Sequence, residues 1–179
     1  PLFNTKGYLA TSLMDILKET DLTKGALYGN FKNKEALSIA VFEYTSDVIV
    51  SRMAKVLRSA SNAGDKLRAI IKYYEDYISR PPIKGGCPIL NTAVEADDLH
   101  PELRVRVLRL IDLLNLSVVK IMMRGIKEGQ IKEDTKVDDL APFFIGSLEG
   151  AIMLSRVQGD LKSYHIISKQ LLKMIQDIE

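Results

Sequence analysis

The chain has 179 residues, a formal net charge of +2, few prolines, one cysteine and many more aliphatic than aromatic residues. This length suffices for a hydrophobic core in one domain, or in a small head joined to a larger body, and the composition favours a soluble, mostly helical protein. The near-neutral charge confines any nucleic-acid binding to a local patch, and the single cysteine excludes an internal disulfide framework and fits a reducing, cytoplasmic compartment.

The sequence contains no segment with the pattern of a membrane anchor or a secretory signal. Its most apolar run, 140–154, is interrupted by Glu149 and is shorter than the roughly 20 residues that a membrane-spanning helix needs. The chain starts at Pro1, without Met, and continues directly into an apolar pair. We therefore expect the start of a first helix to be missing from this sequence.

A short helix is predicted from Ser12 to about Thr20. Ser12 and Asp15 have the spacing of a capping box, in which each side chain bonds the backbone N–H of the other residue. Apolar residues follow at helical spacing, namely Leu13, Ile16 and Leu17. Asp21 is expected to form the turn that follows, because Asp tolerates a left-handed backbone better than most residues.

A second short helix is predicted after this turn, capped by Thr23 and ending near residue 28 or 29. Leu22, Leu27 and Phe31 are expected to point back to the core. Two short helices joined by a tight turn form a helix-turn-helix, whose second helix enters the major groove of DNA. The alternative is a helix pair that serves only as a cap over the core.

Longer helices are predicted over most of the remaining chain. Asn33 is expected to cap a helix that connects the head to the body, with an apolar stripe of Leu37, Ala40, Val41, Tyr44, Val48 and Leu57. Asp65 begins the next helix, whose apolar positions are Leu67, Ile70, Ile71, Tyr74 and Ile78. Further helices are predicted over 87–97, 101–128, 140–156 and 161–178. No strand alternation competes, so we predict an all-α fold.

The predicted helix over 140–156 is apolar nearly all round, so it must be covered on both sides. Gly146 and Gly150 lie four residues apart and would let a second helix backbone come close. These glycines can instead pack within one chain, but we favour a homodimer in which this helix and the last one form a four-helix arrangement. The predicted interface residues are Phe144, Gly146, Leu148, Gly150, Ile152, Leu171 and Ile175.

The predicted second helix of the head has residue types suited to reading DNA. Gly25, Ala26 and Gly29 carry almost no side chain, so the backbone can lie close to bases and phosphates. Lys24 can donate to guanine O6 and N7, and Asn30 can form paired hydrogen bonds with adenine. These two residues are the candidates for sequence readout.

Four further residues are candidates for phosphate contacts. Tyr28 and Lys34 stand at the end of this helix and at the start of the next one, where they can fix the register on the DNA backbone. Thr11 and Ser12 can donate from a hydroxyl or a backbone N–H at the N-terminus of the first short helix, which itself attracts phosphate.

The stretch GYLATSLMDILKETDLTKGALYGNFKNKEALSIAVFE resembles the DNA-binding head of the TetR family of bacterial transcriptional regulators. The pairs Gly7-Tyr8, Thr11-Ser12 and Asp15-Ile16 and the run from Lys24 to Leu37 carry this resemblance. It implies a three-helix head with a truncated first helix over 1–45, and a helical ligand-binding and dimerisation domain over 46–179. The DNA contacts that it implies are Thr11, Ser12, Lys24, Gly25, Ala26, Tyr28, Gly29, Asn30 and Lys34. Asp21 departs from the family, which usually has glycine in the turn.

The segment GGCPILNTAVEADDLHPEL resembles a TetR subgroup in which a Gly-Cys pair is followed by Asn and Ala-x-Glu. In the family this region is a helix bordering the ligand cavity. Aromatic side chains with a few polar tips suit a small apolar ligand. The residues predicted to line the cavity are Tyr73, Tyr77, Cys87, Asn91 and Phe143.

Cys87 has two readings. It follows two glycines and precedes Pro88, so it is expected at a helix N-terminus, where the dipole lowers the pKa of a thiol and would suit a sensor of electrophiles or oxidants. The alternative, which we favour, is a buried and inert thiol.

Glu95, Asp97, Asp98 and His100 invite a metal interpretation. Carboxylates just before Pro101 are more typical of a solvated helix end, and one nearby His is too few, so we predict neither a metal nor a cofactor.

The prediction for function is a DNA-binding transcriptional regulator, favoured as a repressor over an activator. The protein would bind a palindromic double-stranded DNA operator. It would leave this operator when a small molecule or an electrophile binds to the protein. The resemblance implies that such a ligand moves the body helices and changes the spacing of the two DNA-reading helices. One alternative is a helical dimeric protein-interaction module without DNA binding; the other, least favoured, is a cysteine-dependent enzyme using Cys87 with His100 or His165.

Overall fold

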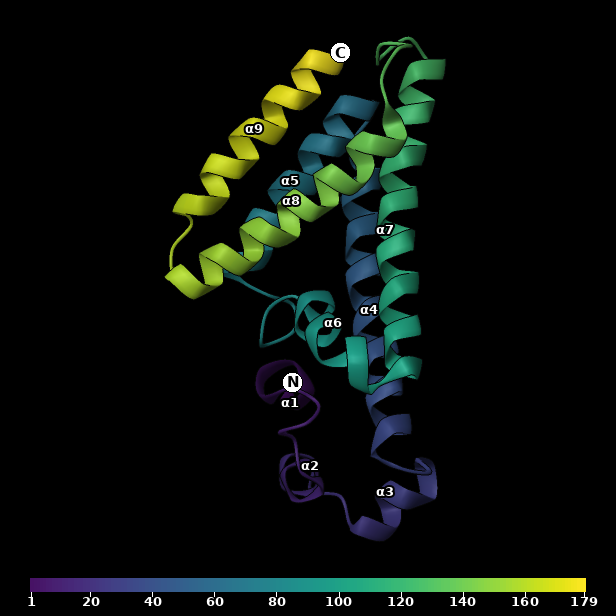
Figure 1. The fold of residues 1–179 in the computed structure, drawn as a ribbon, viewed down its shortest axis with the longest axis vertical. Helices are drawn as coiled ribbons and strands as arrows, with labels where there is room; N and C mark the ends of the chain where they lie inside the picture. Colours follow the sequence, from purple (N-terminus) through teal and green to yellow (C-terminus); the bar gives the residue numbers. More distant parts are fainter. The chain divides into compact units, whose positions relative to one another are not determined.

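The computed structural model describes the backbone of residues 1–179 and every side chain except those of residues 97–99. The described residues form nine α-helices and no strand, which confirms the all-α prediction (Figure 1). The helices are α1 (Leu2–Lys6), α2 (Leu13–Thr20), α3 (Lys24–Asn30), α4 (Lys34–Arg58), α5 (Ala63–Ser79), α6 (Pro88–Leu99), α7 (Pro101–Lys127), α8 (Val137–Gln158) and α9 (Lys162–Ile178).

The chain divides into two compact units. The head unit consists of Pro1–Val48 and Pro82–Leu110, and the body unit consists of Ile49–Pro81 and Ile111–Glu179. The helix α6 and the first part of α7 therefore belong to the head unit, together with α1, α2 and α3. The functional boundary at residue 45 stays a prediction, because compactness does not test where the functions divide.

Local side-chain caps explain why the head forms two short helices. Ser12 Oγ accepts a hydrogen bond from Asp15 N at 3.1 Å, and Asp15 Oδ2 accepts one from Ser12 N at 2.9 Å, so the predicted capping box is confirmed. Asp21 ends α2 with a φ of 53°, in the left-handed region, also as predicted. Thr23 Oγ1 accepts from Ala26 N at 3.1 Å and caps α3.

A small apolar cluster holds α2 and α3 against α4. Its buried centre consists of Ile16, Leu27 and Leu37, with Leu2, Phe3, Leu13, Leu17, Phe31 and Val41 packed around it. The predicted inward position of Leu22 is wrong, because this side chain is exposed in the turn before the Thr23 cap.

The buried side of α4 differs from the predicted stripe. Tyr44, which was predicted to face the core, is 70% exposed. The buried positions from residue 38 onward are instead Ser38, Phe42, Thr45, Ile49 and Met53. Two of these residues are polar, and the hydroxyl of each donates a hydrogen bond to a backbone carbonyl of α4. Ser38 Oγ donates to Glu35 O at 2.7 Å, and Thr45 Oγ1 donates to Val41 O at 2.6 Å. This local bonding removes the cost of burying a hydroxyl.

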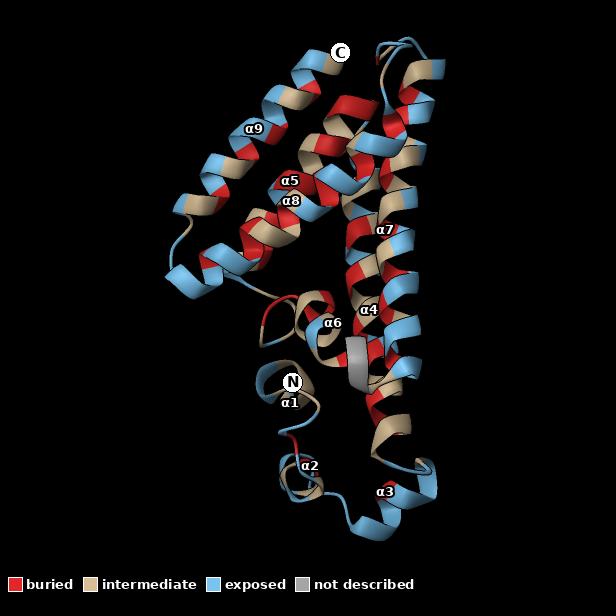
Figure 2. Ribbon diagram, viewed as in Figure 1, coloured by how far each residue is buried: buried red, intermediate tan, exposed pale blue. Residues whose placement is uncertain are grey.

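In the body unit, α8 and α9 pack against each other and both pack on α5. By length and composition alone α8 could cross a membrane, and among the described residues no other helix meets this criterion. Its inner side, however, consists of buried residues that pack among the body helices (Figure 2).

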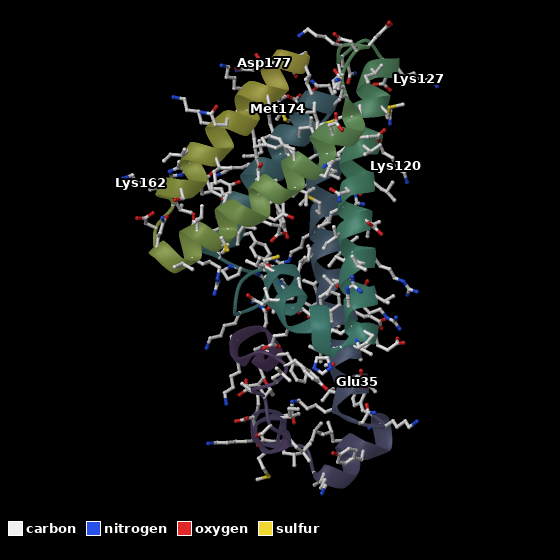
Figure 3. All side chains as sticks on the ribbon, viewed as in Figure 1. Glu35, Lys120, Lys127, Lys162, Met174 and Asp177 are labelled. Carbon is white, nitrogen blue, oxygen red and sulfur yellow. The ribbon has the colours of Figure 1, made fainter. Side chains whose placement is uncertain are left out.

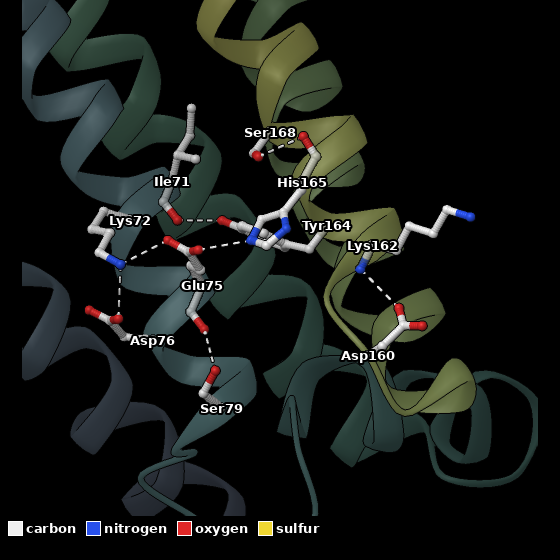
Figure 4. Close-up of polar contacts among 10 residues, drawn as sticks. All are labelled: Ile71, Lys72, Glu75, Asp76, Ser79, Asp160, Lys162, Tyr164, His165 and Ser168. Atoms are coloured by element: carbon white, nitrogen blue, oxygen red, sulfur yellow. Dashed lines mark hydrogen bonds and ion pairs between the residues drawn. The ribbon is translucent and has the colours of Figure 1, made fainter.

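Polar contacts also join α5 to α9 (Figure 4). Glu75 lies 2.8 Å from Lys72 Nζ and 3.0 Å from His165 Nε2. The hydrogen bond from Lys72, followed by that from His165, holds the pKa of the Glu75 carboxyl below its ordinary value. The hydroxyl of Tyr164 donates to Ile71 O, and burial raises the pKa of Tyr164.

Candidate nucleic-acid interface

The helix α3 has one buried apolar position and an outward side made of small and polar residues. Leu27 is buried in the head cluster, which fixes the orientation of the helix. The residues that α3 exposes are Lys24, Gly25, Ala26, Tyr28, Gly29 and Asn30 (Figure 2). All six predicted DNA contacts on this helix are therefore accessible from outside the chain.

The two glycines of α3 are not explained by packing within this chain. A Cβ at Gly29 would have no neighbour within 4 Å, and a Cβ at Gly25 would reach only Thr23 Oγ1, at 4.0 Å. Glycine costs helix stability, roughly 0.5–1 kcal/mol relative to Ala in a helix interior. The two glycines leave the backbone of α3 open to close approach from outside the chain.

Asn30 is held on its own helix in this structure. Its Nδ2 donates to Ala26 O at 2.9 Å, and the bond is exposed to solvent. An exposed hydrogen bond is readily exchanged, because water competes for both partners. Asn30 can therefore give up this bond to pair with a base.

The two predicted contacts at the start of α2 differ in access. Thr11 is fully buried and its hydroxyl donates to Gly7 O at 2.5 Å, so the predicted DNA contact by this hydroxyl is wrong. The side chain instead stabilises the link between α1 and α2. Ser12 is exposed, and its hydroxyl is used in the capping box with Asp15.

An ion pair fixes α1 against α2 beside this surface. Lys6 Nζ lies 2.7 Å from Asp15 Oδ1. Hydrogen bonds from Lys6, and then from Ser12, hold the pKa of the Asp15 carboxyl well below its ordinary value. Asp15 therefore stays ionised, and it partly neutralises a cation close to the predicted phosphate contacts.

Lys34 begins α4 and contacts an aromatic ring that had no predicted role. Lys34 Nζ lies 4.4 Å from the centroid of the Tyr8 ring, within the range of a cation–π contact. Burial, followed by the charge of Glu35 in the first turn of α4 (Figure 3), raises the pKa of the Tyr8 hydroxyl. The Gly7-Tyr8 pair was recognisable in the sequence, but its contact with Lys34 was not.

Lys32 is a further cation near this surface that the motif did not single out. It is exposed in the short link between α3 and α4. Its place between Lys24 and Lys34 in the chain makes it an additional candidate for a phosphate contact.

The predicted dimer residues divide into two groups. The five large ones are fully buried inside a single chain, so the prediction that they contact a second chain is wrong: Phe144, Leu148, Ile152, Leu171 and Ile175. Gly146 and Gly150 lie on the outward side of α8, where a Cβ would have no neighbour within 4 Å. Exposed apolar residues share this side, namely Phe143, Met153, Leu154 and Val157.

The predicted ligand residues belong to both units. Tyr73 and Tyr77 lie on α5 of the body unit, and Cys87 and Asn91 belong to the head unit, so their common cavity stays a prediction. Phe143 is 55% exposed on the outward side of α8, so its predicted place in a pocket is wrong. Cys87 is 3% exposed, in agreement with the buried reading of this thiol.

A cavity in the head and a cavity in the body are both lined by residues other than the predicted ligand residues. The cavity in the head has a volume of about 30 Å³ and lies beside Tyr8 and Glu95. The cavity in the body has a volume of about 170 Å³ and is lined by residues that include Lys66, Lys120 and Arg124. Both are smaller than the roughly 300–1,000 Å³ of a typical ligand pocket.

The described residues contain no group of three or more His, Cys, Asp or Glu residues that could hold a metal ion. Asp97 and Asp98 have side chains outside the described part of the chain. Glu95 is used differently, because its carboxylate accepts a hydrogen bond from Tyr8 N.

Two models of known protein families match this chain. The model described as bacterial regulatory proteins, tetR family, matches residues 1–41. The model described as tetracyclin repressor-like, C-terminal domain, matches residues 63–171. The resemblance found in the sequence is thereby confirmed for both parts of the chain.

Individual relatives agree with these matches. The HTH-type transcriptional repressor DhaR of Mycobacterium sp. (strain GP1) is 28% identical over 158 residues, which cover 88% of this chain and 78% of DhaR. The structure of a TetR transcriptional regulator from Chloroflexus aurantiacus J-10-FL is 36% identical, has a TM-score of 0.94, and matches over 98% of this chain and 88% of its own. The structure of FadR of Bacillus subtilis, in complex with stearoyl-CoA, is 20% identical and has a TM-score of 0.69. The match covers 97% of this chain and 91% of FadR, and it shows a likeness of fold alone.

Proposed function

The chain belongs to the TetR family and is a DNA-binding transcriptional regulator, and we propose that it is a homodimeric repressor that leaves a palindromic operator when a small molecule binds. The observation that carries the proposal is the outward side of α3. This side joins exposed readout residues to two glycines that packing within the chain does not require. The relatives are named as regulators, which favours regulation over the enzyme alternative.

In the proposed complex, each α3 enters a major groove. Lys24 and Asn30 contact base edges, while Tyr28, Lys34 and the N-terminus of α2 contact phosphates. Gly25 and Gly29 let the helix backbone approach the groove. Two copies of α3 would then read half-sites about one helical turn apart, roughly 34–36 Å.

A second copy of the chain is proposed to cover the outward side of α8. The apolar residues on this side are exposed in the single chain, and Gly146 and Gly150 leave room for a helix to approach. An exposed contiguous apolar surface on a soluble protein is typical of a protein–protein interface. A symmetric dimer uses the same surface twice, which matches the two-fold symmetry of a palindrome.

The proposed signal is a small molecule rather than an electrophile. FadR, which shares this fold, binds stearoyl-CoA, so the fold can accept an effector. Cys87 is buried, and a thiolate must be accessible before an electrophile can modify it. The effector would act by favouring a conformation in which the two copies of α3 no longer match the half-sites.

The direct test is a footprint and gel-shift titration with the DNA that flanks the gene for this chain. We expect protection of a palindromic site at salt concentrations where unrelated DNA is not bound. Asn30→Ala should lose affinity for this site, whereas Lys127→Ala, in the last turn of α7 in the body unit (Figure 3), should not. Binding without any sequence preference would overturn the proposal and favour the protein-interaction alternative.

The direction of regulation needs a separate measurement. A reporter gene placed behind the footprinted site should be transcribed less when the wild-type chain is present. An increase that disappears with Asn30→Ala would identify an activator instead.

A further inference from the structure

We propose that Tyr8 and Glu95 are positioning residues for the DNA contact of Lys34, so that α6 influences operator affinity without touching DNA. The inference rests on the proposed operator binding and concerns contacts within the head unit alone. It assigns roles to two side chains that lie outside the helix-turn-helix, which comprises α2 and α3.

The first step is the attachment of α6 to α1. Asn91 Nδ2 lies within hydrogen-bond distance of Asn4 O at 3.0 Å, Asn4 Oδ1 at 2.9 Å and Gly85 O at 2.8 Å. Asn4 Nδ2 donates in turn to Lys84 O at 3.0 Å and Gly86 O at 2.9 Å. Both side-chain amides are therefore used to fix α1 against α6 and the loop before it.

The second step is the contact of Glu95 with the segment after α1. Glu95 lies one turn after Asn91 on α6, so the two side chains lie on the same side of the helix. The Glu95 carboxylate accepts a hydrogen bond from Tyr8 N. Gly7 makes this approach possible, because a Cβ there would overlap the carboxylate and the φ of 83° favours glycine.

The third step is the Tyr8 ring. It contacts His100 edge to face with a centroid distance of 4.2 Å, and it lies 6.0 Å from the ring of Phe3. These neighbours and the backbone bond to Glu95 fix the position of the ring. Its face then holds Lys34 Nζ at 4.4 Å.

The consequence for DNA binding follows from the flexibility of lysine. A lysine side chain loses considerable rotamer freedom when it pairs with a phosphate. A ring that already restricts Lys34 reduces this loss and directs the ammonium group. A shift of α6 would move Glu95 and Tyr8, and with them the cation, while α3 itself stays unchanged.

A double-mutant cycle tests the link between Tyr8 and Lys34. Tyr8→Leu should lower operator affinity about two- to fivefold, the size of an exposed cation–π contact, whereas Tyr8→Phe, which keeps the ring, should retain the affinity. In the Lys34→Ala background, Tyr8→Leu should have no further effect. Equal effects in both backgrounds would overturn the inference.

The role of Glu95 is tested by comparing Glu95→Ala with Glu95→Gln. Both remove a negative charge, which by itself favours DNA binding, but only Gln keeps an oxygen that can accept from Tyr8 N. Glu95→Ala should bind the operator more weakly than Glu95→Gln. It should also lower the slope of log affinity against log salt by about one, as Lys34→Ala does. Equal affinities and equal slopes for the two variants would contradict the positioning role.

Two controls separate this inference from simpler explanations. Val94→Ala changes the exposed residue next to Glu95 and should leave affinity and salt slope unchanged. Thermal unfolding identifies variants that fail to fold. If Glu95→Ala is one of them, the double-mutant cycle of Tyr8 and Lys34 tests the inference by itself. A wild-type chain without operator binding would refute the proposed function, whereas a wild-type chain that binds, with additive Tyr8 and Lys34 effects, would refute only this inference.

Discussion

The outward sides of α3 and α8 both carry pairs of glycines that packing within the chain does not require, yet the residues beside those glycines differ in kind. On α3 they are polar or cationic, including Lys24, Tyr28 and Asn30. On α8 they are apolar, including Phe143 and Met153. A helix that exposes glycines admits a close partner, and the neighbouring side chains determine whether that partner is a polyanion or a second apolar helix.

The largest effect is expected from placing a charge on the outward side of α8. Met153→Glu would bury an unpaired carboxylate twice in a symmetric interface, at a cost of about 3 kcal/mol or more, so the dimer should dissociate roughly a hundredfold more readily. Analytical ultracentrifugation over a concentration series measures this shift. Met123→Glu is the matched control, because Met123 is exposed on α7. If the Met153→Glu variant remains a dimer, α8 does not form the dimer interface.

On α3, a single readout residue should affect specificity rather than general affinity. Asn30→Ala should cost about 1–3 kcal/mol against the preferred base pair and relax the preference at that position alone. Lys34→Ala should instead weaken binding to all sequences and lower the salt slope by about one. Titrations against a set of operators with single substitutions measure both effects. Identical behaviour of the two variants would contradict the division between readout and phosphate contact.

An internal glycine sharpens the comparison. A Cβ at Gly125 would lie 2.6 Å from Ala63 Cβ and 2.7 Å from Ile131 Cδ1. Gly125→Ala should therefore destabilise the chain by about 1–3 kcal/mol through overpacking. Gly150→Ala, which meets nothing within its chain, should stabilise it by about 0.5–1 kcal/mol.

These two glycine variants are best compared in a Met153→Glu background, so that dimerisation does not contribute. Urea unfolding followed by circular dichroism gives both free energies of unfolding. Equal destabilisation by the two variants would mean that Gly150 also packs within its own chain.

The smallest effect is expected at the solvent-exposed contacts through which Glu75 joins α5 to α9. Its pKa lies below the ordinary value of about 4.5 in the folded chain, so the pair contributes stability above that pH and loses it as the pH falls through the folded pKa. Glu75→Gln should lower the free energy of unfolding at pH 7 by less than about 1 kcal/mol. The difference from wild type should shrink at pH 3.5. A difference that grows on acidification would reverse this assignment.

The caps of the head helices could be predicted from the sequence because their causes are local. Ser12 with Asp15, the left-handed Asp21 and Thr23 each act within three residues of their partners or on their own backbone. The same holds for the exposed side of α3, whose orientation follows from the buried Leu27. A cap and a helical period depend only on residues that are near one another in the chain, so the sequence alone predicts them.

The buried side of α4 and the use of the Thr11 hydroxyl were predicted wrongly for a related reason. Ser38 and Thr45 look like surface residues in the sequence, but each hydroxyl bonds a carbonyl of its own helix and can therefore be buried. Thr11 was assigned to DNA, yet its hydroxyl bonds Gly7. A hydroxyl pattern does not reveal whether its partner is a backbone carbonyl or an external ligand.

The sequence by itself determined the family, the all-α fold and the caps of the short head helices, and it proposed the residues that would read DNA. Only the tertiary structure decided which side of α8 faces inward, because both sides are apolar and periodicity cannot distinguish them; Phe144 and Leu148 proved to be core, while Phe143 is exposed. It also revealed that Tyr8 joins Glu95 to Lys34. Contacts between residues far apart in the chain depend on how helices pack, and no local spacing encodes them.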